Sequence, residues 1–138
     1  MNKLLASAAQ SGAADLAERG VEVRYSPDGQ DFFRLTIRPA GAGNEAMLKG
    51  YADAVRPYVS SGVPADKLDV KIQRLISAKL MAQHVVIGWN EEDFGAPYSR
   101  DAVEETLKAD PNFAVWLANA SNDQIELRRL FREQNAGN

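Results

Sequence analysis

The segment GAGNEA, residues 41–46, has the spacing that comes nearest to a cofactor site in this chain. It matches the dinucleotide fingerprint G-x-G-x-x-G/A, and it lies after an expected strand and before an expected helix. That chemistry also needs a parallel strand after the helix, and an acidic residue about 20 positions on to bind the ribose. Asp66 and Asp69 lie near that distance, but they begin a second helix. We therefore interpret Gly41 and Gly43 as a hinge. A small nucleotide-binding protein is the alternative.

Other residues that could do chemistry are few. His84 is the only histidine and the chain has no cysteine, so the sequence excludes multi-histidine and thiolate metal sites. Glu91, Glu92 and Asp93 form an acidic run, but the run lacks the alternating spacing and the final glutamate of a calcium loop. It predicts a solvated turn. Neither G-x-S-x-G nor a P-loop motif is present. We expect no enzymatic activity, no cofactor and no metal.

The composition is typical of one folded domain spanning residues 1–138. The chain is 45% hydrophobic and 25% charged, with a net charge of −3. This mildly acidic balance argues against a nucleic-acid partner. No apolar segment approaches the ~20 residues that cross a bilayer, so we expect no membrane partner. The first twelve residues, MNKLLASAAQSG, contain too short an apolar run for a secretion signal, and we expect a frayed helix there.

Hydrophobic periodicity predicts a mainly α fold with a small β-hairpin, in the α+β class. Residues 13–19 form a helix that Gly20 ends, although residues 1–20 are poorly assigned as a whole. Alternating apolar residues over 21–38, around a Pro-Asp-Gly turn, predict the hairpin. Residues 44–88 predict a pair of longer antiparallel helices on which the hairpin packs. The buried stripe of the first helix is Met47, Tyr51, Ala54, Val55 and Tyr58, and that of the second continues to His84 and Ile87.

Three short helices are predicted over residues 99–133. Ser99 caps the first, and Asp110 with Pro111 begins the second. A capping box that starts at Ser121 begins the third. In the helical pair predicted over residues 44–88, the second helix is expected to begin at Pro64 or Asp66. We expect residues 134–138 to form a disordered tail.

Three segments carry a resemblance to one family. FFRLTIRPAGAGNEAM, residues 32–47, looks like a strand followed by the glycine-containing entry into a long helix, and VRPY, residues 55–58, looks like the end of that helix. VVIGWNEEDFGAPYS, residues 85–99, looks like a hydrophobic helix end with a tryptophan, an acidic loop and a helix cap. Together they resemble the tail assembly chaperones of long-tailed bacteriophages and related prophages. The resemblance covers most of residues 21–131.

The resemblance implies a non-enzymatic chaperone in the host cytoplasm. Such proteins bind the phage tape-measure protein, keep it soluble, help to recruit the tail tube protein and leave as the tube polymerises. A homo-oligomer remains open. The leading alternative is a phage structural or connector protein that is retained in the virion, where the hairpin extends the sheet of a neighbour.

A chaperone of helical segments needs apolar contact area rather than reactive groups. The candidate partner-binding residues are Val85, Val86, Ile87, Trp89, Phe94 and Tyr98. The three consecutive residues 85–87 cannot all face one way on a helix. We interpret Trp89 and Tyr98 mainly as closing the joint between two helical blocks. Phe94, which lies between an aspartate and a glycine, is the expected exposed anchor.

Overall fold

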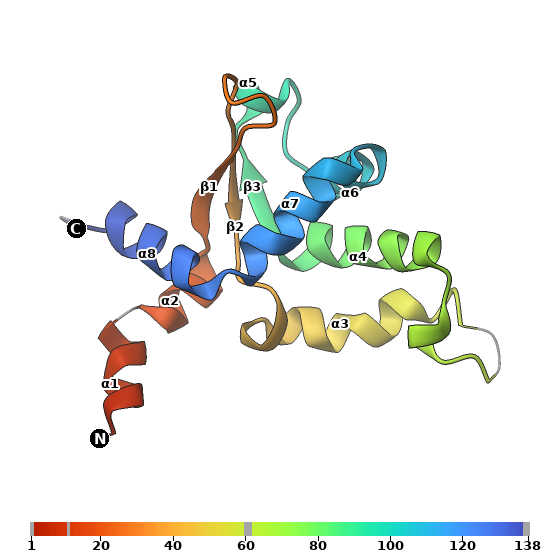
Figure 1. The fold of residues 1–138 in the computed structure, drawn as a ribbon, viewed down its shortest axis with the longest axis horizontal. Coiled ribbons are helices and arrows are strands. Elements are labelled where there is room, and N and C mark those ends of the chain that lie inside the picture. Colours follow the sequence, from red (N-terminus) through yellow and green to blue (C-terminus); the bar gives the residue numbers. More distant parts are fainter. Residues whose placement is uncertain (1, 11, 60–61, 137–138) are drawn as a thin grey trace.

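The structure is a computed structural model that describes residues 2–10, 12–59 and 62–136. Within these residues the chain forms eight α-helices, two short 3-10 helices and one three-stranded antiparallel sheet in the order β1-β2-β3 (Figure 1). The mainly α, α+β class predicted from the sequence is confirmed.

The predicted hairpin forms from β1 (Val21–Tyr25) and β2 (Phe33–Ile37). The strands pair from Val21 opposite Ile37 to Tyr25 opposite Phe33. Val21, Val23, Leu35 and Ile37 are buried, which is the alternation that the sequence predicted. In the turn, an Asp28 carboxylate oxygen accepts from the N–H groups of Gln30 and Asp31 at 2.9 Å. This Asx-type turn fixes the register of the two strands.

A third strand replaces the expected end of the second long helix. Helix α4 (Val70–His84) stops at His84, and β3 (Val86–Trp89) pairs antiparallel with β2. The prediction of a helical pair through residue 88 is therefore wrong at its end. The β-branched run of residues 85–87 favours a strand, and pairing with β2 satisfies backbone groups that a two-stranded hairpin leaves open.

The remaining helices follow local capping signals. Ser99 and Asp110 are N-caps, as predicted, and Asn44 is a further N-cap; each side chain accepts a backbone hydrogen bond from the first turn of its helix. Helix α4 begins at Val70 with Asp69 as its N-cap, later than predicted. These elements are α1 (Lys3–Gln10), α2 (Ala13–Arg19), η1 (Gly41–Gly43), α3 (Glu45–Val55), η2 (Ala65–Lys67), α5 (Glu91–Phe94), α6 (Arg100–Ala109), α7 (Pro111–Asn122) and α8 (Gln124–Gln134).

Helix α8 differs from its prediction at both ends. Its N-cap is Asp123, whose side chain accepts from the N–H of Glu126, while Ser121 is buried within α7. The predicted capping box at Ser121 is therefore wrong. At the other end the helix includes Gln134, one residue beyond the predicted boundary at residue 133. Residues 137 and 138 of the predicted tail lie outside the described residues.

Two hydrophobic cores organise the fold. The main core joins the sheet to α4, α6, α7 and α8, with Leu35, Val103, Leu117 and Leu127 at most 1% exposed. A smaller core between α3 and α4 contains Ala54, Val55, Ile76 and Leu80. Figure 1 shows α3 and α4 side by side at one end of the molecule, with α1 and the C-terminus at the other. We call α3, α4 and their connection the arm. In the described residues, no helix combines the length and apolarity needed to cross a membrane.

Candidate protein-binding surfaces

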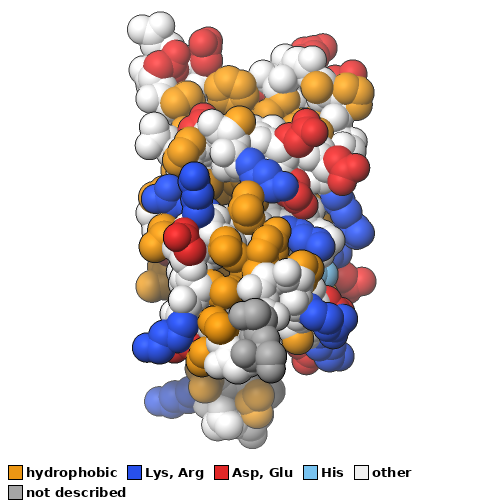
Figure 2. Space-filling model, turned by 90° about the vertical axis from the view of Figure 1, so that its right-hand side faces the viewer, with side chains coloured by type: hydrophobic (Ala, Val, Ile, Leu, Met, Phe, Trp, Pro, Cys, Tyr) orange, Lys and Arg blue, Asp and Glu red, His pale blue; other side chains and the backbone are white. Residues whose placement is uncertain are grey.

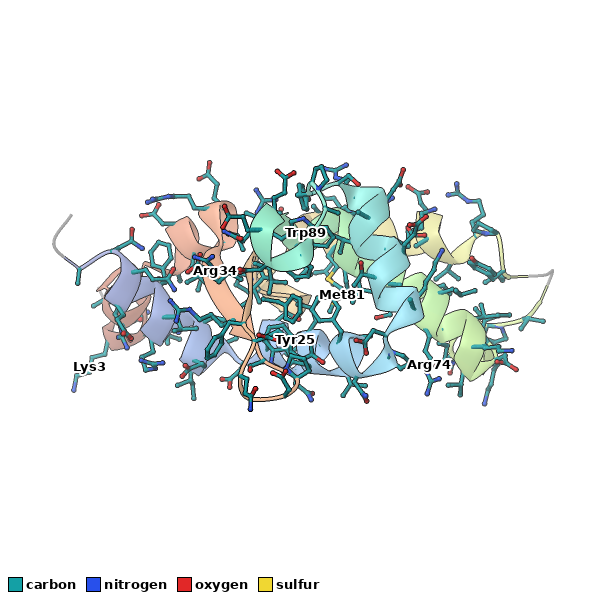
Figure 3. The ribbon with its side chains drawn as sticks, turned by 90° about the horizontal axis from the view of Figure 1, so that it is seen from above. Lys3, Tyr25, Arg34, Arg74, Met81 and Trp89 are labelled. Carbon is teal, nitrogen blue, oxygen red and sulfur yellow. The ribbon has the colours of Figure 1, made fainter. Side chains whose placement is uncertain are left out.

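Aromatic side chains gather where the hairpin end of the sheet meets α5 and α7. Trp89 stacks on Phe94 with ring centroids 4.2 Å apart, and Phe94 meets the ring of Phe33 edge-on at 5.3 Å. Tyr25 continues the cluster to Phe113 at 5.1 Å. Figure 3 shows Tyr25 and Trp89 in the central part of the molecule, far from Lys3 at one end. A cleft of about 390 Å³ opens beside these rings, with Glu105 and Asp110 among its lining residues.

The rings of this aromatic cluster pack mostly against one another. Phe94 is half-buried and packs against the main core, so the prediction of an exposed anchor is wrong. The acidic and glycine neighbours that suggested exposure belong to the short helix α5, which lays Phe94 inward on Trp89. Burial raises the pKa of Tyr25, and the Asp110 carboxylate adds to this effect.

The other binding residues predicted from the sequence also pack within the protein. Val85 and Val86 are 0% and 1% exposed, so neither offers area to a partner, and Ile87 is half-buried. The Trp89 indole N–H donates to the carbonyl of Ala96 at 2.9 Å. The Tyr98 hydroxyl donates to the carbonyl of Val86 at 2.9 Å. Trp89 and Tyr98 therefore join β3 to the loop before α6.

An ion pair fastens α5 to the sheet. The Arg34 Nε donates to an Asp93 carboxylate oxygen at 2.8 Å, and the Arg34 backbone N–H donates to the same oxygen at 2.9 Å. These hydrogen bonds hold the pKa of Asp93 below its usual range. The predicted solvated turn is thus correct for Glu91 and Glu92, which are exposed, but not for Asp93.

Asp93→Asn is expected to destabilise the protein at neutral pH and to lose this effect in acid. Because the folded-state pKa of Asp93 is lowered, its stabilisation is complete above the unfolded pKa of about 4 and disappears as pH falls through the folded pKa. Urea unfolding of wild type and variant from neutral to acidic pH measures the difference. The difference should shrink below about pH 4. Glu92→Gln, at an exposed neighbour, is the control; a pH-independent difference for Asp93→Asn contradicts the ion-pair assignment.

Exposed apolar side chains lie instead along α3 and the turn after it. Leu48 and Tyr51 are 57% and 47% exposed, although the sequence pattern placed Tyr51 and Tyr58 in the core. Leu48 and Tyr51 lie three residues apart on α3, and the exposed Tyr58 and Val59 follow in the turn after the helix. We call Leu48, Tyr51, Tyr58 and Val59 the α3 stripe. The stripe was missed because Tyr51 was assigned to the same face as Met47 and Ala54.

The arm carries a net positive charge around its apolar surface. Residues 45–84 contain six Lys or Arg and four Asp or Glu, a net charge of +2, whereas the whole chain carries −3. Figure 2 shows hydrophobic side chains gathered on this end of the molecule, with Lys and Arg on both sides and some Asp and Glu among them. An apolar surface with basic borders is complementary to a helix that carries an apolar stripe and acidic flanks.

The glycine-containing segment 41–46 has a structural role. Asn44 is buried, and its side-chain amide donates to the carbonyls of Pro39 at 3.1 Å and His84 at 2.8 Å. The same side chain caps α3. This ties the entry of α3 to the end of α4. The strand before the segment, β2, is antiparallel to both neighbours, so the described residues form no parallel βαβ unit of the kind that binds dinucleotides.

His84 is half-buried at the end of α4. Burial lowers its pKa, and the positive charges of Arg100 and Arg38 lower it further, so the imidazole is neutral at pH 7. A β-carbon on Gly50 would lie only 2.7 Å from His84 Nε2, so there is no room for a side chain at residue 50. His84 therefore packs α4 closely against α3. No group of three or more His, Cys, Asp or Glu in the described part of the chain is arranged to hold a metal ion.

Comparisons with protein-family models, curated proteins and solved structures found no match for this chain.

Proposed function

We propose that this protein is a non-enzymatic assembly chaperone of a long-tailed phage or prophage, acting in the host cytoplasm. Its partner is the tape-measure protein, which it holds before the tail tube forms; the tail tube protein is a further partner. The three segments that resemble tail assembly chaperones support this proposal. The observation that carries it furthest is the exposed apolar α3 stripe with its basic borders.

The α3 stripe suits a helical partner that must later be released. Leu48 and Tyr51 lie one helical turn apart on α3, so they can pack against the apolar stripe of a second helix. Burying such side chains stabilises a complex by about 1.5–3 kcal/mol each. A few contacts of this size bind a segment with moderate affinity, which the polymerising tube can then displace.

The double substitution Leu48→Asp with Tyr51→Asp is expected to weaken tape-measure binding by roughly 100-fold or more, because two buried apolar contacts become buried carboxylates. Both side chains are about half exposed, so the variant should fold normally. The measurement is co-expression with the tape-measure protein of the same phage, followed by its soluble fraction and its co-purification with this chain.

Ile125→Asp is the matched control, because Ile125 is 84% exposed but lies on α8, outside the arm. Wild type and this control should keep the tape-measure protein soluble. If wild type fails to do so, the proposed function is wrong. If all three proteins bind equally, the function stands but the α3 stripe is not the binding surface.

Mass spectrometry of purified virions distinguishes this chaperone from a structural protein. A chaperone leaves as the tube polymerises, so the chain should be absent from mature particles. A stoichiometric amount in the virion would instead favour the structural or connector role.

A further inference from the structure

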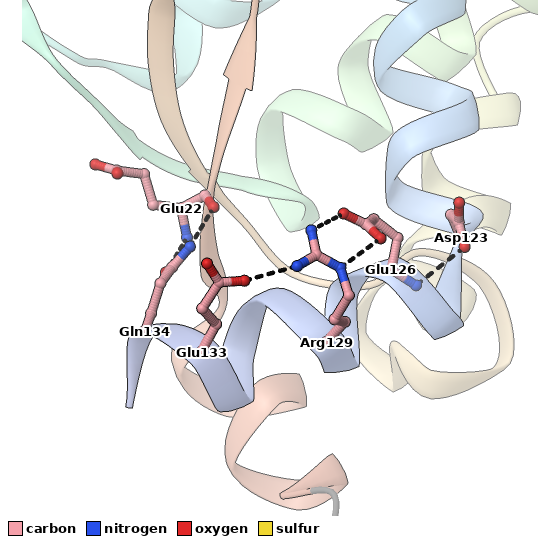
Figure 4. A network of polar contacts seen from close by, with 6 residues as sticks. All are labelled: Glu22, Asp123, Glu126, Arg129, Glu133 and Gln134. Carbon is pink, nitrogen blue, oxygen red and sulfur yellow. Dashed lines mark hydrogen bonds and ion pairs between the residues drawn. The ribbon is translucent and has the colours of Figure 1, made fainter. Parts of the chain in front are cut away.

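One side chain closes part of the free edge of the sheet. Among the strands of the described residues, β1 pairs only with β2, and at its other edge the amide of Gln134 meets the backbone of Glu22. The Glu22 N–H donates to Gln134 Oε1 at 3.1 Å, and Gln134 Nε2 donates to the Glu22 carbonyl at 2.8 Å. Figure 4 shows Gln134 reaching from the last turn of α8 to this peptide. The amide thus makes the two hydrogen bonds that a neighbouring antiparallel strand would make.

The edge continues past Gln134. Peptide groups along an antiparallel strand alternate in direction, so the N–H and carbonyl of Arg24 point to the same side as those of Glu22. A groove of about 700 Å³ lies between this part of β1 and helices α7 and α8, with Glu22, Val23 and Arg24 in its wall. The helices therefore leave room beside β1.

We propose that the β1 edge pairs with the β1 edge of a second copy of this chain, and that Gln134 must leave the edge for this to happen. In an antiparallel pair related by a two-fold axis at Val23, Glu22 lies opposite Arg24 of the second copy, and Arg24 opposite its Glu22. Each pair exchanges two backbone hydrogen bonds. The two three-stranded sheets become one continuous sheet.

The charges on the strand favour a second copy as the occupant. Glu22 and Arg24 are both exposed and lie on the same face of β1, so the two-fold pairing sets opposite charges against each other twice. Within one chain, Arg24 lies directly opposite Arg34 of β2, an unfavourable neighbour of like charge. A Glu22 carboxylate on the outer side relieves that repulsion.

The first test removes the amide that occupies the edge. Gln134→Ala should associate more tightly than wild type in sedimentation equilibrium over a wide range of protein concentration, because nothing competes for the Glu22 peptide. Arg132→Ala, an exposed residue of the same turn, is the control and should behave as wild type. If Gln134→Ala and wild type self-associate equally, Gln134 does not compete with a second β1 strand for the Glu22 peptide, and the proposal is wrong.

The second test changes the charges in the Gln134→Ala background. Arg24→Glu or Glu22→Arg alone sets like charges opposite each other twice and should weaken self-association on the order of tenfold. The double exchange, Glu22→Arg with Arg24→Glu, should restore it. A mixture of the two single variants should form the mixed dimer, because one strand is then acidic and the other basic. Monomers in that mixture, with circular dichroism showing folded protein, overturn the proposal.

Discussion

Replacing Gly20 with alanine is expected to lower the free energy of unfolding by about 3 kcal/mol or more. Gly20 ends α2 with φ 72° and ψ −174°, a backbone region open essentially to glycine alone. A β-carbon there would also lie 2.7 Å from the carbonyl oxygen of Ile37, so β2 would have to move. Because β2 is the central strand, the displacement reaches both of its neighbours. Urea unfolding measures the loss.

Gly29→Ala separates the effect of backbone strain from the effect of the close contact with Ile37. Gly29 also has a positive φ, 76°, but a β-carbon there meets nothing within 4 Å. Only backbone strain remains, and we expect a loss of about 1 kcal/mol. Equal losses for the two variants would show that the contact with Ile37 is easily relieved.

Phe94→Ala is expected to cost about 2–3 kcal/mol of stability. The substitution removes a ring that stacks on Trp89 and meets Phe33 and Phe113 edge-on. Full burial of phenylalanine corresponds to a larger loss, but this side chain is half-buried. The sequence instead predicted an exposed anchor, whose removal would leave stability nearly unchanged. Thermal and urea unfolding give the measurement.

Phe32→Ala is the matched control, because Phe32 precedes β2 and is 53% exposed. Its substitution should change stability by less than about 0.5 kcal/mol. If Phe94→Ala is equally mild, Phe94 is not part of the aromatic packing and its assignment as a surface anchor returns.

The parts of the fold that could be predicted depend on local signals. The hairpin follows from alternation around an Asp-Gly turn, and Ser99 and Asp110 mark helix starts by their own side chains. Strand β3 depends on a partner some fifty residues earlier in the chain, because Leu35 faces Trp89. Its residues follow α4 without a glycine or proline break, so periodicity alone extended the helix.

The binding surface was harder to predict for a chemical reason. Aromatic and β-branched residues fill cores and interfaces alike, so the types of Trp89 and Phe94 could not distinguish the two uses. Only the position of α5, fixed by the bond between Arg34 and Asp93, shows that Phe94 faces inward. The exposure of Tyr51 depends equally on where α4 lies, since α4 covers Ala54 and leaves the next face of α3 open.

The small core between α3 and α4 lets α3 unfold separately from the main core, to which α4 belongs. Met47 is the α3 residue that packs against both cores, so the described part of α3 is tied to the rest of the molecule mainly through α4. Local unfolding of α3 therefore breaks few contacts elsewhere. A ligand seated on α3 would be held by an element that can unfold locally, and its departure would leave the sheet and the aromatic packing unchanged.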